Sequence, residues 1–130
     1  MNIALIAHDK KKELIVDLCI AYKGILQQHS LFATYTTGSF IEEGASLKVY
    51  KFSPGELGRM EQIAARVSLN EIDMVIFLRD PARDLQYDHD TSLLLNFCDT
   101  NSIPIATNIA TAEMLIRGLE RGDLSWRELI

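Results

Sequence analysis

Five short apolar runs alternate along this chain with longer stretches of helical periodicity, and this alternation strongly constrains the fold. Such a pattern is typical of βαβ units, whose strands lie parallel in one sheet. We therefore predict a single α/β domain over residues 1–130, a doubly wound three-layer structure with a five-stranded, mainly parallel sheet. The predicted strands are Ile3–Ile6, Leu31–Ala33, Val49–Phe52, Ile72–Leu78 and Ile103–Thr107.

The stretches between these runs predict helices, several of them with a recognisable start. Asp9 is a candidate N-cap for the first helix, since aspartate side chains accept hydrogen bonds from free N–H groups there. A short helix is expected after Gly38, with Phe40 facing inward, and the last helix is expected to bury Met114. Further helices are expected over about 57–68 and 91–100, with a long polar loop over 80–90.

Composition narrows the class of protein. Hydrophobic residues make up 48% of the 130 residues, enough for one buried core. No apolar stretch reaches the roughly 18 residues that a membrane span needs, and the start of the chain lacks the basic region of a signal peptide. The net charge of −5 argues against a general binder of nucleic acids or membranes. Cys19 and Cys98 are expected as buried thiols, and the chain is expected in the cytoplasm.

Small polar clusters follow each predicted strand, at the edge where parallel strands end and where ligands bind in such folds. Thr34, Thr36 and Thr37 stand before a glycine at a strand-to-helix turn, where main-chain N–H groups attract anions. Lys12 is placed to add a positive charge. These residue types suit a small phosphorylated molecule, although threonines that simply cap a helix and a solvated lysine remain alternatives.

Carboxylates near the same edge are candidates for acid–base work. Asp9, Asp80 and Asp90 follow different strands or their loops, and His8 could orient a substrate oxygen. Plain N-caps remain an alternative for Asp9 and Asp90, and His89 is interpreted as an exposed loop residue. The sequence has no metal-ligand spacing, nucleophile elbow or Walker loop, so neither a metal nor a cofactor is expected.

The segments 3–12, 36–38, 75–81 and 103–113 together resemble bacterial methylglyoxal synthases, and the resemblance runs almost without gaps along the chain. It implies conversion of dihydroxyacetone phosphate, through an enediolate, to methylglyoxal and inorganic phosphate, without metal or cofactor and usually in a hexamer. It implies that the phosphate is held by Lys12, Thr34, Thr36, Thr37 and Gly55. It also implies that the reacting end is lined by His8, Asp9, Asp80 and Asp90.

The chain departs from the family pattern after the third predicted strand. Met60 occupies the position of the family's proton-abstracting aspartate, and a thioether cannot accept that proton. The family's loop histidine falls on Tyr87, and its phosphate-contacting serine falls on Pro54, which has no N–H to donate. Glu61 lies one residue from the base position, but about 100° away around a helix. The pocket wall is expected to comprise Tyr35, Pro54, Arg59, Met60, Tyr87 and Asn108.

Two hypotheses about function follow. The first is a degenerate relative that binds a phosphorylated small molecule, such as a nucleotide-type signal, for sensing or sequestration without turnover. The alternative is an active methylglyoxal synthase whose base is one of the carboxylates Asp9, Asp80, Asp90 or Glu61. A scaffold with a vestigial pocket is a third possibility. The expected partners are a phosphorylated ligand and further copies of the chain, with neither nucleic acid nor membrane.

Overall fold

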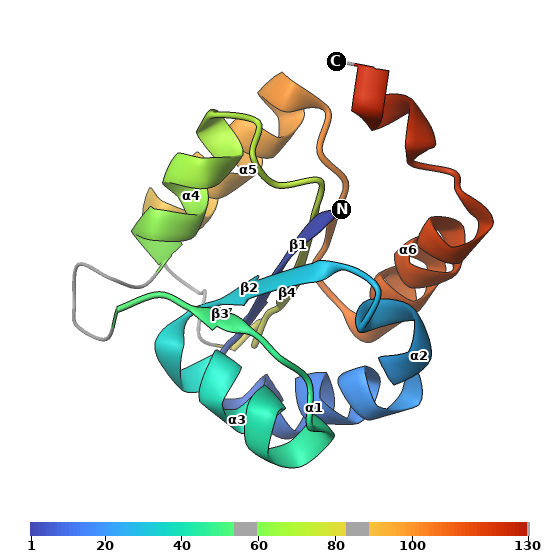
Figure 1. Ribbon diagram of the computed structural model, residues 1–130. Coiled ribbons are helices and arrows are strands. Elements are labelled where there is room, and N and C mark those ends of the chain that lie inside the picture. The colour runs from blue at the N-terminus through green and yellow to red at the C-terminus, as the bar shows by residue number, and fades with distance from the viewer. Residues whose placement is uncertain (54–59, 83–88, 130) are drawn as a thin grey trace.

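The computed structural model describes residues 1–53, 60–82 and 89–129, and it places one five-stranded sheet at the centre of the molecule (Figure 1). The strand order is β3-β2-β1-β4-β5, and all four pairings are parallel. The fold class predicted from the sequence is therefore confirmed. The strands are β1 (Asn2–Ala7), β2 (Ser30–Ala33), β3 (Tyr50–Lys51), β4 (Met74–Leu78) and β5 (Ile105–Ala106).

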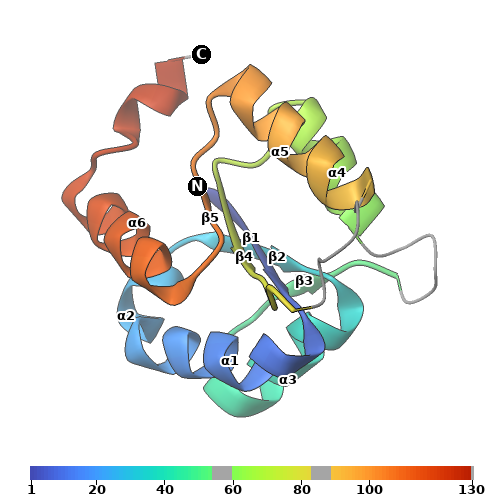
Figure 2. The ribbon, with the colours of Figure 1, turned by 180° about the vertical axis from the view of Figure 1, so that it is seen from behind.

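Helices cover both faces of the sheet (Figures 1 and 2). One face carries α1 (Lys12–Ala21), α2 (Lys23–Leu26), α3 (Tyr35–Ala45) and α6 (Ile109–Arg121). The other carries α4 (Met60–Ser68) and α5 (His89–Asn101), which pack side by side. The short 3-10 helix η1 (Asp9–Lys11) precedes α1, and the 3-10 helix η3 (Ser125–Leu129) follows α6.

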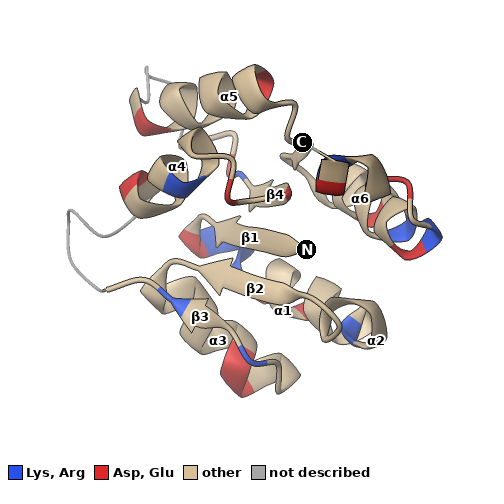
Figure 3. Cartoon of the chain, turned by 45° about the horizontal axis from the view of Figure 1, so that its top comes forward, with Lys and Arg blue, Asp and Glu red and all other residues tan. Residues whose placement is uncertain are grey.

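The two-residue periodicity of the central strands creates two separate cores. Ile3 and Leu5 of β1 face the core beneath α1, α3 and α6, whereas Ala4 and Ile6 face the core beneath α4 and α5. All five residues of β4 are buried, as expected for a strand covered on both faces. Figure 3 shows that β1, β2 and β4 carry no acidic or basic residue, so charge is confined to the helices, the connections and the edge strand β3.

Several helix details differ from the sequence-based expectations. Asp9 does not cap a helix with its side chain: it is the first residue of η1, and its carboxylate binds Lys12 instead. The helix expected after Gly38 begins earlier, at Tyr35, and its direction leaves Phe40 48% exposed. Met114 is 71% exposed because Ala112 and Ile116 occupy the inward face of α6.

The two cysteines are buried free thiols, as expected, one in each core. Within the described ranges, none of the helices combines the length and the apolar character that a bilayer crossing requires.

Candidate functional site at the carboxyl edge of the sheet

The ends of β1, β4 and β5 are joined by main-chain hydrogen bonds at one edge of the sheet. His8 N–H donates to Leu78 O (3.2 Å), and Arg79 N–H donates to Thr107 O (3.3 Å). The chain runs outward from β1 to β3 and then returns to start β4 on the other side of β1. This reversal between β1 and β4 is the position where open α/β sheets bind ligands. The sequence analysis expected the candidate site at this same edge, and that location stays a prediction.

His8 is fixed in one orientation at this switch point. Its ring is 8% exposed and packs edge-on against Phe77, with centroids 5.1 Å apart. Its Nδ1 accepts a hydrogen bond from the Asp80 N–H at 2.8 Å. Because an accepting Nδ1 carries no proton, the proton of the imidazole resides on Nε2. The structure thus brings His8 and Asp80 together and defines Nε2–H as the donor group of the His8 ring.

Lys12 is turned back from α1 toward the end of β1. Its Nζ donates to Ala7 O at 3.2 Å and to Asp9 Oδ1 at 3.0 Å. The Lys12 side chain is 13% exposed, whereas the Asp9 side chain is 90% exposed. The ammonium group is therefore held at the carboxyl edge rather than in bulk solvent, as a phosphate-binding role requires.

The turn from β2 into α3 presents free donors to the same edge. Thr34 is the N-cap residue of α3, yet its hydroxyl makes no capping hydrogen bond. Gly38 N–H is the first main-chain donor that bonds in the helical pattern, and it donates to Thr34 O at 2.8 Å. The N–H groups of the three residues before Gly38 therefore have no acceptor inside α3. Thr37 is fully buried, and within the described structure its Oγ1 has no hydrogen-bond partner. Thr36 is exposed beside it.

Lys51 is a neighbour of this turn that the sequence analysis did not identify. A Cβ added to Gly38 would lie 2.5 Å from Lys51 Cγ, so the glycine allows the lysine stem to cross α3 closely. Lys51 Nζ binds Glu42 Oε1 at 2.6 Å and lies 5.4 Å from the centre of the Tyr35 ring. This hydrogen-bonded pair raises the pKa of Lys51 and lowers the pKa of Glu42. The sequence feature that could have identified Lys51 is its position at the end of β3, the strand that follows β2.

The remaining predicted site residues lie elsewhere or have structural roles. Asn108 is the N-cap of α6, and its Oδ1 accepts from Thr111 N–H at 3.1 Å. Met60, Glu61 and Asp90 line a groove of about 280 Å³ between α4 and α5. His89, expected in a loop, is the first residue of α5 and is exposed.

Four predicted residues, Pro54, Gly55, Arg59 and Tyr87, lie outside the described residues. In the described ranges, no group of three or more His, Cys, Asp or Glu side chains is arranged to hold a metal ion.

Comparisons with known proteins identify relatives over the whole chain. The MGS-like domain model matches residues 15–107. The chain is 58% identical over 130 residues to the methylglyoxal synthase of Caldicellulosiruptor saccharolyticus, covering 100% of this chain and 92% of that protein. It is 54% identical over 129 residues to the methylglyoxal synthase of Listeria welshimeri, covering 99% and 96%.

A solved structure agrees with this similarity. The crystal structure of methylglyoxal synthase from Elizabethkingia anophelis matches with a TM-score of 0.80 and 36% identity, covering 88% of this chain and 76% of that one. The hypothesis of a degenerate binding protein without turnover is therefore wrong: relatives at 50–58% identity carry the name of an enzyme, which favours the alternative. Met60 does not outweigh this similarity, and two carboxylates, Asp9 and Asp80, follow the ends of β1 and β4.

Proposed function

Since the chain belongs to the methylglyoxal synthase family, we propose that it converts dihydroxyacetone phosphate into methylglyoxal and inorganic phosphate, as a carbon–oxygen lyase. The observation that carries this proposal is the 58% identity, over the full length of the chain, to a relative named for that activity.

The reaction sets three requirements on the site. A base removes a proton from the hydroxymethyl carbon beside the carbonyl group, which leaves an enediolate. A donor must stabilise the negative charge on the former carbonyl oxygen. The C–O bond to phosphate then breaks, the terminal C–OH becomes an aldehyde as its proton leaves, and the resulting enol rearranges to methylglyoxal. The leaving phosphate must be bound throughout.

The β2–α3 turn supports the phosphate-binding part of the proposal. Three N–H groups at the start of α3 and the unpartnered, buried Thr37 hydroxyl offer donors to phosphate oxygens. The positive end of the α3 dipole adds to this attraction, and the Lys12 ammonium supplies a full charge at the neighbouring strand end. In this mechanism Thr34 and Thr36 complete the cradle.

His8 fits the role of the oxyanion donor. The hydrogen bond from Asp80 N–H to Nδ1 keeps the imidazole in the tautomer that carries its proton on Nε2. Nε2–H then stabilises the enediolate oxygen by hydrogen bonding. Because the ring is buried against Phe77, it needs little reorganisation during the reaction.

Asp80 is the carboxylate that the geometry favours as the base. It follows the central strand β4 at the switch point and is half-buried; its main-chain N–H donates to His8, and its Oδ1 accepts from Ala82 N–H at 3.0 Å. Asp9 is almost fully exposed, and its carboxylate is engaged by Lys12 Nζ at 3.0 Å. Glu61 is exposed and, with Asp90, faces the groove between α4 and α5.

The activity is tested by incubating the purified chain with dihydroxyacetone phosphate and measuring methylglyoxal and phosphate in parallel. We expect equal amounts of the two products, at a rate well above that of a protein-free control. Asp80→Asn is expected to lower kcat by about 10²–10⁴-fold, the usual contribution of a positioned base. Glu61→Gln is the matched control and should leave kcat within a few fold. An absence of turnover above the protein-free rate contradicts the proposal.

The phosphate cradle is tested separately by Thr37→Val, which removes the hydroxyl while keeping the shape of the side chain. We expect KM to rise by about tenfold, the value of one hydrogen bond to a charged group, without loss of folding. Thr100→Val is the control, since its hydroxyl bonds Asn96 O on α5 instead. Equal KM values for the two variants would remove Thr37 from the site.

Three further properties are proposed on the family resemblance alone: a homohexameric assembly, a cytoplasmic location, and catalysis without metal or cofactor. Sedimentation equilibrium of the purified chain tests the assembly, and a mass below that of a hexamer contradicts it. Turnover after prolonged dialysis against a chelator tests the independence from metal, and a loss of turnover that added metal restores contradicts it.

A further inference from the structure

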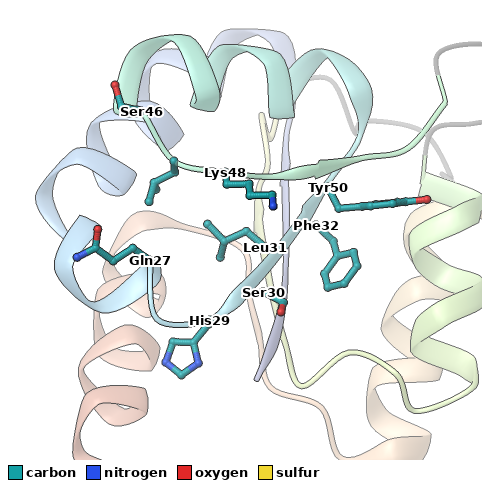
Figure 4. A pocket seen from close by; sticks show the side chains of 9 residues that line it. Gln27, His29, Ser30, Leu31, Phe32, Ser46, Lys48 and Tyr50 are labelled. Carbon is teal, nitrogen blue, oxygen red and sulfur yellow. The ribbon is translucent and has the colours of Figure 1, made fainter.

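A second cavity lies at the opposite, amino-terminal edge of the sheet. Figure 4 shows it around the start of β2, between the turn that follows α2 and the segment that connects α3 to β3. Its volume is about 510 Å³, within the range of about 300–1,000 Å³ typical of small-molecule sites. Leu31 and Phe32, which point to opposite faces of the sheet, both line it, so the cavity wraps around the free edge of β2.

The floor of this cavity includes an open strand edge. The ladder between β2 and β3 begins only at Phe32, which pairs with Tyr50. Ser30 N–H donates to Met1 O on the β1 side. Successive residues of a strand turn their main-chain groups to opposite sides, so the N–H of Leu31 points away from β1. Leu31 precedes Phe32, the first residue of β2 that pairs with β3. The cavity therefore has a main-chain donor in its floor.

The charge of the cavity is positive although the protein is acidic. None of the nine described residues that line it is Asp or Glu. The Lys48 side chain extends across the cavity toward Tyr50, and within the described part of the chain no acid pairs with it. His29 Nδ1 accepts from the ammonium group of Met1 at 3.0 Å. Burial and this ammonium group lower the pKa of His29. Since Nδ1 accepts, the ring presents Nε2–H as a donor.

Aromatic rings form the other end of the cavity. The rings of Phe32 and Tyr50 lie 5.6 Å apart, and Tyr50 is 55% exposed. The guanidinium of Arg66 lies 5.3 Å from the Phe32 ring and 5.5 Å from the Tyr50 ring. Among the described residues no carboxylate pairs with Arg66. The aromatic end is therefore apolar, flat-sided and close to a second positive charge.

We propose that this cavity is a binding site for a small anion that carries a flat ring, an aromatic or heteroaromatic carboxylate or phosphate. The anionic group accepts from Lys48 Nζ and Leu31 N–H, and the ring packs against Phe32 and Tyr50.

This site is separate from the catalytic edge but mechanically connected to it. The four residues of β2 separate Ser30 from the Thr34 turn by about 13 Å. The helix α3 also connects the two edges: it runs over about 18 Å from the Thr34 turn to Ser46, its C-cap residue, which lines the cavity. An anion bound here contacts both elements that hold the phosphate cradle. The proposal goes beyond the catalytic function and does not depend on it.

The test is a titration of the ¹⁵N-labelled chain, followed by amide NMR signals. Phenyl phosphate and benzoate are the probes, inorganic phosphate lacks the ring, and benzyl alcohol lacks the charge. We expect both probes to shift the signals of Ser30, Leu31 and Lys48 with low-millimolar dissociation constants, as suits ligands of this size. The two comparison compounds should bind there at least about tenfold more weakly.

Variants assign the binding to this cavity. Lys48→Glu is expected to weaken both probes by at least about tenfold, whereas Lys10→Glu, with the same change in net charge at the opposite edge, should not. Shifts confined to Thr36, Thr37 and Gly38 would mean that the probes bind only the phosphate cradle, which overturns the proposal. Equal affinity in the two variants also overturns it. The proposal is also overturned if the Leu31 amide of the ligand-free chain is protected from hydrogen exchange and this protection disappears on dilution. In that case a second copy of the chain fills the cavity.

Discussion

Replacing Arg127 with alanine is expected to lower the free energy of unfolding by about 3–5 kcal/mol, because it leaves buried acceptors and an acid without their partner. Arg127 belongs to η3 near the end of the chain and is 4% exposed. Its guanidinium binds Asp73 Oδ1 (3.2 Å), Asn70 Oδ1 (2.5 Å) and the main-chain oxygens of Asn101 (3.1 Å) and Ser102 (2.9 Å). One side chain thus joins the segment after α4 to the segment after α5.

The magnitude follows from these contacts. A hydrogen bond to a charged group contributes about 1.5–3 kcal/mol, but bonds that share one guanidinium are not additive. The Asp73 side chain is 23% exposed and also accepts from Asn2 N–H, so water and this donor offset part of the loss. The expected loss in the free energy of unfolding is therefore limited to about 3–5 kcal/mol, the range observed when one partner of a buried pair is removed. Arg127→Lys keeps the charge but not the planar fork, and should cost about half as much.

Urea unfolding followed by far-ultraviolet circular dichroism measures this effect over the whole chain. The matched control is Arg121→Ala, which removes a bridge to Asp123 whose side chains are 63% and 54% exposed. That control should cost less than about 1 kcal/mol. A loss of less than 1 kcal/mol for Arg127→Ala, or equal losses for the two arginines, would refute the assignment of Arg127 as a buried anchor.

Two further predictions concern glycines and cysteines. Gly38→Ala should destabilise the chain by about 1–3 kcal/mol in thermal unfolding, since the added Cβ would meet Lys51 Cγ at 2.5 Å. Gly24→Ala should instead stabilise the chain by up to about 1 kcal/mol, because its added Cβ has nothing within 4 Å. The reverse order would contradict the packing. Burial raises the pKa of Cys19 and of Cys98 to about 12, so at pH 8 both thiols should react with Ellman's reagent only as the chain unfolds. The neutral thiols stabilise the fold fully below pH 9, and this contribution declines as the pH rises toward 12; immediate reaction at pH 8 would contradict their burial.

The sequence predicted the sheet and its two-sided covering because these depend on periodicity. An almost wholly apolar run at Ile72–Leu78 is typical of a strand buried on both faces, and alternation of strands with helices favours parallel pairing. It also predicted which strand ends carry polar side chains, including His8 and Thr37. Helix boundaries were less accurate: nothing local distinguishes a helix that starts at Tyr35 from one that starts after Gly38.

The sequence by itself thus determined the architecture, the family resemblance and the edge at which the candidate site forms, since each follows from residue order along one segment or a few. Only the tertiary structure decided that Asp80 N–H fixes the position of the proton on His8 and that Lys51 crosses α3 at Gly38. It also decided that Arg127 of η3 binds Asp73 and Asn70, which precede it by more than 50 residues. These contacts join residues distant in sequence, and a hydrogen bond depends on distance and angle, which no periodicity encodes.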